Sequence, residues 1–308
     1  MHPAPSIIAF TTLSGLGYGL AVMLGLGLLD PAAIATKIAW VAALTAIGGG
    51  LLSSTLHLGN PQRAWRAFSQ WRSSWLSREG VMAIVTFIPL IMTAWACVIE
   101  GRQAVVPGLT GAVLSLCTVF CTAMIYASLK SVDAWHTRLT PTCYLLFSLA
   151  GGAVAASFFA FCGGGNVRWL PIVAVVVLVG AWAVKRVWRR RMQAEAPLST
   201  PESATGLGAI GRVRLFERPH MTENYLTREM GFRVARKHAA KLWIIALTLG
   251  GVVPFVLFGL LLLAGTQAGF GAALVAGLAL ASHVVGVLAE RWLFFAEARH
   301  AVMNYYGD

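Results

Sequence analysis

The chain has 308 residues, of which 57% are hydrophobic and only 12% charged, and its mean hydropathy is +0.71. A soluble domain of this length would need far more charged surface, whereas lipid can cover the outside of a helical membrane protein. The formal net charge is +12, but the arginines lie between apolar spans rather than on one basic face, which excludes a nucleic-acid-binding protein. Anionic lipid head groups or an acidic partner explain this charge better.

Eight segments are apolar and long enough to cross a bilayer, which takes about 20 residues of helix. We therefore predict an all-α membrane protein, with residues 1–308 forming one polytopic bundle of eight transmembrane helices. β-Barrel strands would alternate with period two, and no such pattern occurs. The expected spans are Ile7–Leu29, Ala33–Leu56, Val81–Val98, Pro107–Leu129, Pro141–Phe161, Trp169–Val187, Leu242–Ala264 and Ala268–Phe295.

The connections between these spans differ in length and charge. The second, His57–Glu79, is rich in arginine and tryptophan, the fourth is short, and residues 188–241 form a long basic loop. The side of the membrane that holds the odd-numbered connections has only three of the 24 Lys and Arg residues, namely Lys37, Arg102 and Arg168. An even number of spans puts both termini on the arginine-rich side, and the positive-inside rule predicts that this side is cytoplasmic.

The second connection brings together the side chains best suited to chemistry. His57 closes the second span, Arg63 and Arg66 follow at helical i,i+3 spacing, and Arg78 and Glu79 open the third span. Two neighbouring helix ends therefore present an imidazole, a carboxylate and several guanidiniums at one membrane interface. Ionisable groups at membrane depth are costly and tend to be functional.

A quinone head group suits such a place. Histidine can donate a hydrogen bond to a ring carbonyl, a nearby glutamate can relay protons, and arginine favours the negative charge that develops on reduction. An alternative interpretation stays open on spacing alone: His57 caps its helix, and Glu79 forms a structural ion pair with Arg78.

Two longer segments resemble a known family. His57–Phe68 with Ser74–Glu79, and Glu290–His300 near the C-terminus, resemble the membrane-anchor subunits of the DMSO reductase family. The eight spans fit as well, so the resemblance covers almost the whole chain. It implies an anchor in the bacterial cytoplasmic membrane that holds a molybdopterin catalytic subunit and an iron–sulfur subunit. It also implies a quinone, ubiquinone or menaquinone, bound by His57 and Glu79 with Arg78, Arg63 and Arg66.

Two activities compete within that family. DMSO reductases oxidise quinol and keep their catalytic subunits outside the membrane, whereas sulfite-oxidising relatives keep theirs in the cytoplasm and reduce quinone. The stretch Glu217–Met230 resembles the sulfite-oxidising branch more closely. With the charge bias, this predicts the anchor of a cytoplasmic sulfite dehydrogenase; the alternative is a quinol-oxidising anchor of a DMSO reductase or related S- or N-oxide reductase.

No metal or haem is expected in the chain itself; molybdopterin and the clusters belong to the partner subunits. The five cysteines form no CxxC pair, and His283 in the eighth span has no second histidine at similar depth to complete a haem site. We expect His283 to form a hydrogen bond across helices instead. Glu290 and Glu297 share a helix face, and either pairing with the basic loops or a role in proton transfer is open.

Other interpretations come from different classes of protein. A transporter would show charges at the bilayer midplane and paired broken helices, whereas the charges here lie at helix ends. A purely structural anchor without a quinone site would be insensitive to quinone-site inhibitors. Tyr225–Lys241, with an N-cap candidate at Thr222, is either an interfacial amphipathic helix or a docking surface for the iron–sulfur subunit.

Overall fold

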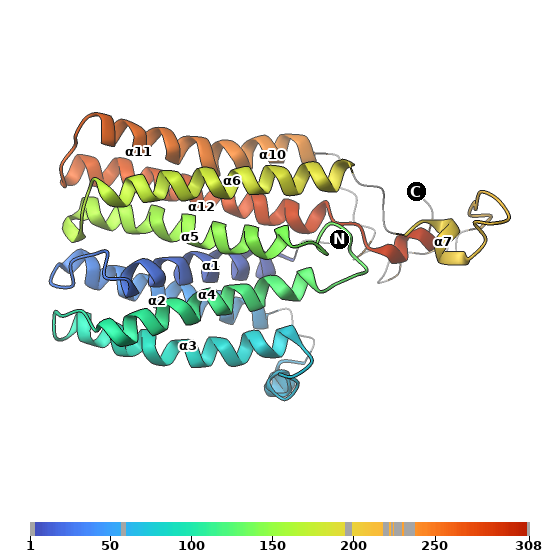
Figure 1. Cartoon of the computed structure of the whole chain (residues 1–308), viewed down its shortest axis with the longest axis horizontal. Coiled ribbons are helices and arrows are strands. Elements are labelled where there is room, and N and C mark those ends of the chain that lie inside the picture. The colour runs from blue at the N-terminus through green and yellow to red at the C-terminus, as the bar shows by residue number, and fades with distance from the viewer. Residues whose placement is uncertain are drawn as a thin grey trace.

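The computed structural model is a helical bundle and describes residues 4–56, 60–194, 199–217, 222, 224, 230 and 238–306. Within this part of the chain, eight helices are long and apolar enough to cross a membrane, which confirms the predicted number. The bundle, drawn in Figure 1, consists of α1 (Pro5–Gly25), α2 (Ile34–Thr55), α3 (Trp75–Val98), α4 (Val105–Ala127), α5 (Leu139–Phe159), α6 (Trp169–Ala194), the pair α10 (Ala239–Leu247) and α11 (Val253–Leu263), and α12 (Phe270–Ala296).

Short elements join or extend these helices. A π-helical turn, Thr248–Val252, joins α10 to α11, so Ala239–Leu263 runs as one span. The 3-10 helix η1 (Pro61–Phe68) precedes α3, and the π-helical turn η2 (Ala160–Gly164) follows α5. Beyond the bundle lie α7 (Pro201–Thr205) and η4 (Ala301–Tyr305).

Two helices begin or end away from the expected position. α3 begins at Trp75 rather than Val81, so Arg78 and Glu79 lie inside the helix instead of opening it. α6 continues to Ala194 instead of ending at Val187, so the first part of the expected loop, 188–241, is helical. Hydropathy locates the part of a helix that lies in hydrocarbon, but a helix can continue through the polar interface wherever its backbone hydrogen bonds continue.

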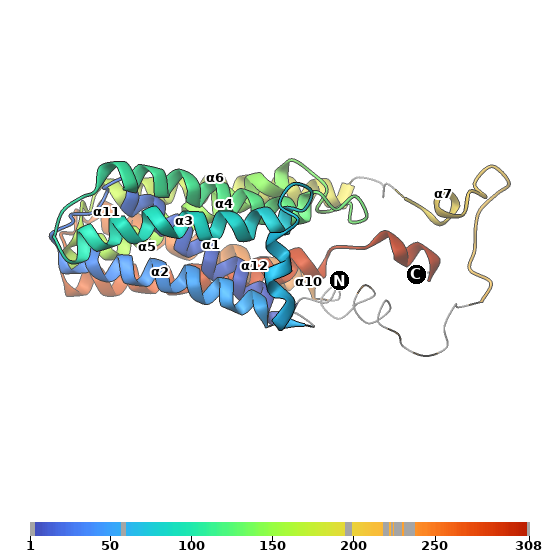
Figure 2. The same cartoon turned by 90° about the horizontal axis from the view of Figure 1, so that it is seen from below.

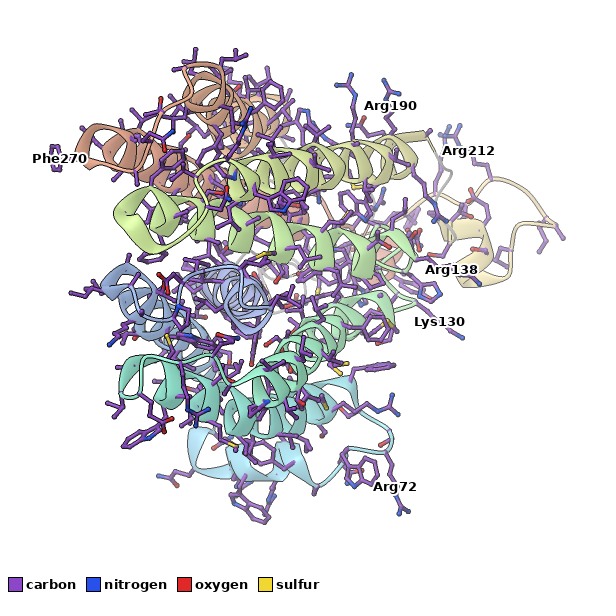
Figure 3. All side chains as sticks on the ribbon, turned by 60° about the vertical axis from the view of Figure 1, so that its left-hand side comes forward. Arg72, Lys130, Arg138, Arg190, Arg212 and Phe270 are labelled. Atoms are coloured by element: carbon purple, nitrogen blue, oxygen red, sulfur yellow. The ribbon has the colours of Figure 1, made fainter. Side chains whose placement is uncertain are left out.

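Consecutive helices run in opposite directions, so α1 begins and α12 ends at the same end of the bundle (Figures 1 and 2). We call this end, where the chain enters α3, α5 and α10, the basic end. In Figure 3 this end carries the labelled cations Arg72, Lys130, Arg138, Arg190 and Arg212. Phe270 marks the opposite end of the bundle. α1 thus begins at the end of the bundle where α12 ends, and the placement of both termini on the cytoplasmic side stays a prediction.

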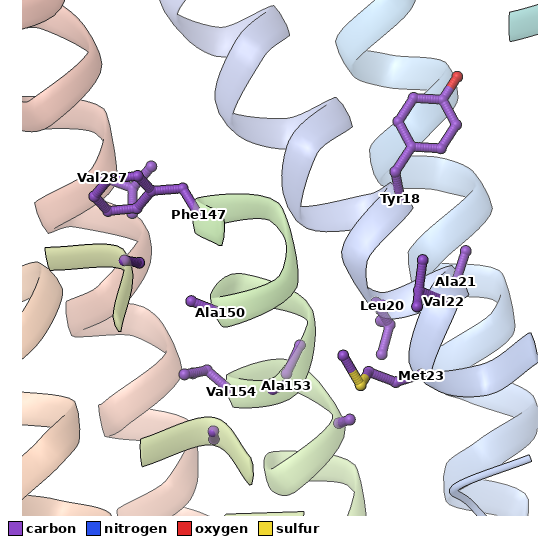
Figure 4. Packing of buried hydrophobic residues seen from close by; sticks show 14 of the residues in the cluster. Tyr18, Leu20, Ala21, Val22, Met23, Phe147, Ala150, Ala153, Val154 and Val287 are labelled. Carbon is purple, nitrogen blue, oxygen red and sulfur yellow. The ribbon is translucent and has the colours of Figure 1, made fainter. Parts of the chain in front are cut away.

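α1 lies at the centre and packs against α2, α4 and α5. Small residues let the backbones touch: a Cβ atom added to Gly19 would lie 1.8 Å from the carbonyl oxygen of Ser148 on α5. Figure 4 shows part of this core: Phe147 of α5 and Val287 of α12 lie together, and Tyr18 of α1 points to the other side of its helix, away from α5. Close packing of small residues replaces the hydrophobic effect as the attraction between helices within a membrane.

Candidate functional site

The connection between α2 and α3 is folded onto the beginning of α3. Ser74 caps the helix, since its Oγ accepts a hydrogen bond from the amide of Ser77 at 3.5 Å. The hydroxyl of Ser77 in turn donates to the carbonyl of Ala67 in η1. Gly80 leaves room for the ring of Phe68, because a Cβ atom there would lie 2.9 Å from the Phe68 Cε1 atom. η1 is thus held across the first turns of α3.

Arg78 points away from Glu79 and holds this connection together. Its Nε donates to the carbonyl of Trp71 at 3.0 Å, and its Nη2 donates to the carbonyl of Arg72 at 2.7 Å. The guanidinium also lies 4.3 Å from the ring centroid of Trp75. No ion pair joins Arg78 to Glu79, both of which the structure describes, so the interpretation of the two as a structural ion pair gains no support.

Glu79 is buried, with 5% of its surface exposed, and its carboxylate is turned into the bundle. The hydroxyl of Thr122 on α4 donates a hydrogen bond to Glu79 Oε1. One turn further along α4, the hydroxyl of Thr118 lies 2.9 Å from that of Thr86 on α3. Polar side chains therefore lie in a row along the interface between α3 and α4. Glu79 is the member of this row nearest the basic end of the bundle.

The remaining expected site residues lie elsewhere or outside the described part of the chain. Arg63 and Arg66 are both exposed on η1, and the Arg66 guanidinium lies 5.6 Å from the ring centroid of Trp65. His57 lies outside the described residues, so its convergence with Glu79 stays a prediction. The same holds for most of Tyr225–Lys241, of which residues 225–229 and 231–237 are not described.

A second cluster of buried charges, which sequence reasoning did not assemble, joins α6 to α12. Lys185 Nζ lies 2.5 Å from Glu290 Oε1, and Arg291 Nε lies 3.2 Å from Glu290 Oε2. All three are almost fully buried, at 1–2% exposure. We call Lys185, Glu290 and Arg291 the α6–α12 ion cluster. Glu290 thus pairs with a residue inside α6 and not with a basic loop, and no sequence pattern near Lys185 indicates this partner.

Aromatic rings surround this cluster. Lys185 Nζ lies 3.6 Å from the ring centroid of Trp188, and the Arg291 guanidinium lies 3.9 Å from that of Tyr144 on α5. Nearer the end of the bundle, Arg189 and Glu297 form an ion pair at 3.0 Å. Cations held against ring faces and a carboxylate are stabilised although they are removed from water.

His283 forms a hydrogen bond across helices, as expected. Its Nδ1 lies 2.7 Å from the carbonyl oxygen of Gly250, in the turn between α10 and α11. Among the described residues, no group of three or more His, Cys, Asp or Glu side chains is arranged to hold a metal ion.

Comparison with known proteins yields one family and two relatives. Residues 1–296 match the family described as DMSO reductase anchor subunit (DmsC). The C subunit of sulfite dehydrogenase from Allochromatium vinosum is 32% identical over 99% of both proteins. The C polypeptide of anaerobic dimethyl sulfoxide reductase from Escherichia coli is 26% identical over 43% of this protein and 48% of its own length. No solved structure matches the protein.

Proposed function

Because the protein belongs to the DMSO reductase anchor subunit (DmsC) family, we propose that this multi-pass membrane anchor passes electrons from sulfite oxidation to the quinone pool. Sulfite would be oxidised in a molybdopterin subunit, and an iron–sulfur subunit would deliver the electrons. The match to the C subunit of sulfite dehydrogenase, over nearly the whole length of both proteins, supports sulfite as the electron source.

The buried carboxylate of Glu79 is the observation that carries the quinone site. An acid inside a membrane protein, held by a hydroxyl and without an ion-pair partner among the described residues, is suited to proton exchange. Trp75 lies one helical turn away on the same face of α3 and packs edge-on against Phe120 of α4, 6.0 Å between ring centroids. A carboxyl group beside two aromatic rings suits a flat, redox-active ring with polar oxygens.

When bound, the quinone takes up two electrons and two protons and becomes quinol. In our proposal His57 donates a hydrogen bond to one ring carbonyl, and Glu79 supplies a proton to a ring oxygen. Arg78 holds the α2–α3 connection in place around the site. Arg63 and Arg66, exposed on η1, add positive potential that attracts electrons to the ring.

We place the basic end at the cytoplasmic face of the bacterial inner membrane, with the partner subunits docked there. The concentration of Lys and Arg at this end supports that orientation. α7 and η4 extend beyond the bundle at the same end, as Figure 2 shows, and offer a surface for a soluble partner. Tyr225–Lys241 belongs to the same connection and is the proposed contact for the iron–sulfur subunit.

The test uses the purified three-subunit complex and two electron acceptors. His57→Ala and Glu79→Gln should each lower sulfite-dependent quinone reduction by at least about 100-fold, the size of effect typical of a lost general acid or positioning group. Sulfite oxidation with a soluble artificial acceptor, which bypasses the anchor, should be unchanged. Glu100→Gln, an exposed glutamate at the opposite end, is the matched control. Unchanged quinone reduction in both site variants would overturn the assignment and leave a structural anchor.

The partial match to the anaerobic dimethyl sulfoxide reductase polypeptide favours one competing function, the oxidation of quinol by an S-oxide reductase. The same complex distinguishes the two. Sulfite with quinone should give turnover, and dimethyl sulfoxide with quinol should not; the reverse result would establish the competing function.

A further inference from the structure

A small cavity of about 20 Å³, which we call the internal cavity, lies between α1, α4, α5 and α12. This is space for one water molecule. The cavity is lined by polar side chains from all four helices, including Thr12, Thr122, Tyr144, Ser148, His283 and Arg291. A water molecule fits a cavity of this size and would give hydrogen bonds to lining groups that lack them.

Two of the lining hydroxyls are buried and have unused hydrogen-bonding capacity. The Thr12 hydroxyl has no partner among the described residues, and that of Tyr144 has at most the neighbouring Arg291 guanidinium, which lies 3.9 Å from the Tyr144 ring centroid. The other lining groups are partly satisfied: Ser148 donates to the carbonyl of Gly15 at 2.7 Å, and His283 uses its Nδ1 on Gly250. A water molecule in the cavity would complete the hydrogen bonding of Thr12 and Tyr144.

The cavity connects the two buried carboxylates of the bundle. On one side it is lined by Thr122, whose hydroxyl donates to Glu79. On the other side it is lined by Tyr144 and Arg291, and Arg291 is paired with Glu290 in the α6–α12 ion cluster. Polar groups of α3 and α4 therefore reach this cavity from one side, and the α6–α12 ion cluster reaches it from the other.

The far side of the ion cluster approaches water. A second cavity, of about 280 Å³, lies at the basic end and is lined by Trp188, Glu297 and His300 together with the exposed Arg191 and Arg299. Trp188 lines this basic-end cavity, and its ring centroid lies 3.6 Å from Lys185 Nζ. Lys185 thus lies directly behind the wall of a solvent-accessible cavity, and Glu290 lies behind Lys185.

We propose that these groups form a proton relay from the basic-end cavity to Glu79, with a water molecule in the internal cavity as its central member. Because the relay ends at Glu79, it rests on the quinone site proposed above. Lys185 passes a proton to Glu290 and is reprotonated by a water molecule that enters from the basic-end cavity past the edge of the Trp188 ring. The proton moves on through the Tyr144 hydroxyl and the internal water. Arg291 stays charged, orients Glu290 and lines the cavity.

Glu79 gives one proton to a ring oxygen of the quinone. The Thr122 hydroxyl then gives its proton to the Glu79 carboxylate and takes one from the internal water. Two successive proton transfers along the relay supply the two protons of each quinol. The two electrons come from the iron–sulfur cluster of the partner subunit. No bond other than O–H and N–H bonds forms or breaks along the relay.

The test compares hydroxyl deletions in the purified complex. Tyr144→Phe and Thr122→Val should lower kcat for quinone reduction by about tenfold or more, while KM for quinone stays within about twofold, because proton supply and not binding is impaired. The solvent isotope effect, measured as the rate ratio in H₂O and D₂O, should rise in both variants. Thr122→Ser keeps the hydroxyl and should restore both values.

Thr93→Val is the matched control. Thr93 is a fully buried threonine of α3 that does not line the cavity, and its hydroxyl donates to Pro89 within its own helix at 2.8 Å. Wild-type kcat and isotope effect in both Tyr144→Phe and Thr122→Val would overturn the relay. If Tyr144→Phe fails to assemble, the comparison of Thr122→Val with Thr122→Ser decides. Wild-type quinone reduction in Glu79→Gln would instead overturn the quinone site itself.

Discussion

Glu79 of α3 is bound by the hydroxyl of Thr122 on α4 and turned away from Arg78, its neighbour in the sequence. Adjacent residues of a helix point in directions about 100° apart, so they seldom share one partner. The acid therefore belongs to the interior of the bundle, and the guanidinium belongs to the connection that covers it.

Loss of the Arg78 guanidinium should loosen that connection without changing the charge state of the interior. In Arg78→Gln the two carbonyls of Trp71 and Arg72 lose their donors, so the segment between η1 and α3 should be cleaved several-fold faster by chymotrypsin under native conditions. The matched control is Arg72→Gln, which keeps the Arg78 contacts. Equal cleavage of Arg78→Gln and wild type would contradict the role of Arg78 as a clamp.

The contact between α1 and α5 should tolerate no side chain at Gly19. A Cβ atom there would lie 1.8 Å from a backbone oxygen, so Gly19→Ala forces the two helices apart and should cost about 1–3 kcal/mol of stability. Gly48→Ala on α2 places its Cβ atom in open space and should be neutral or slightly stabilising. Thermal unfolding of the two variants in detergent makes the comparison, and similar unfolding temperatures would show that α1 and α5 separate without cost.

Hydropathy alone was sufficient to predict the eight spans, because only an apolar helix satisfies its backbone within hydrocarbon. Hydropathy placed the end of α6 too early, at Val187, because the Lys and Arg run that begins at Lys185 is typical of a segment exposed to water. The structure instead places Lys185 against Glu290, more than a hundred positions away, and no local pattern reveals such a partner. Likewise, residue type was enough to select Glu79, whereas its partner Thr122 depends on how α3 and α4 are rotated about their axes.

Removing the carboxylate of the α6–α12 ion cluster should destabilise the protein more than removing the amine of Lys185. Glu290→Gln leaves Lys185 and Arg291 without a carboxylate and should cost about 3–5 kcal/mol, whereas Lys185→Met leaves Glu290 paired with Arg291 and should cost less. Glu100→Gln removes an exposed ion pair at the opposite end and should cost at most about 1 kcal/mol. The unfolding temperatures of the three variants should follow this order, and an inverted order for Glu290→Gln and Lys185→Met would contradict it.

Glu297 should make the protein less stable as the pH rises. Burial raises the pKa of its carboxyl above the ordinary value, and the ion pair with Arg189 opposes this only in part. A carboxyl with a raised pKa in the folded state favours the protonated form, so its contribution to stability is present at low pH. That contribution is lost as the pH rises from the ordinary carboxyl pKa of about 4.3 through the raised value.

The measurement compares wild type with Glu297→Gln over this range. The unfolding temperature of the wild type should fall relative to that of the variant as the pH rises, and the difference should level off once the carboxyl is fully ionised. A wild type that gains stability relative to Glu297→Gln on the same titration would mean that the ion pair with Arg189 outweighs the cost of burial.

Quinone reduction by this complex should move no net charge across the membrane. The residues proposed to supply protons lie toward the basic end of the bundle, the same end at which the partner subunits are proposed to deliver electrons. Electrons and protons would then enter the quinone from one side. Complex reconstituted in liposomes with quinone should therefore oxidise sulfite without a response from a potential-sensitive dye. A potassium gradient with valinomycin serves as the positive control for the dye. A dye response that depends on sulfite and disappears with a quinone-site inhibitor would place electron entry and proton uptake on opposite sides.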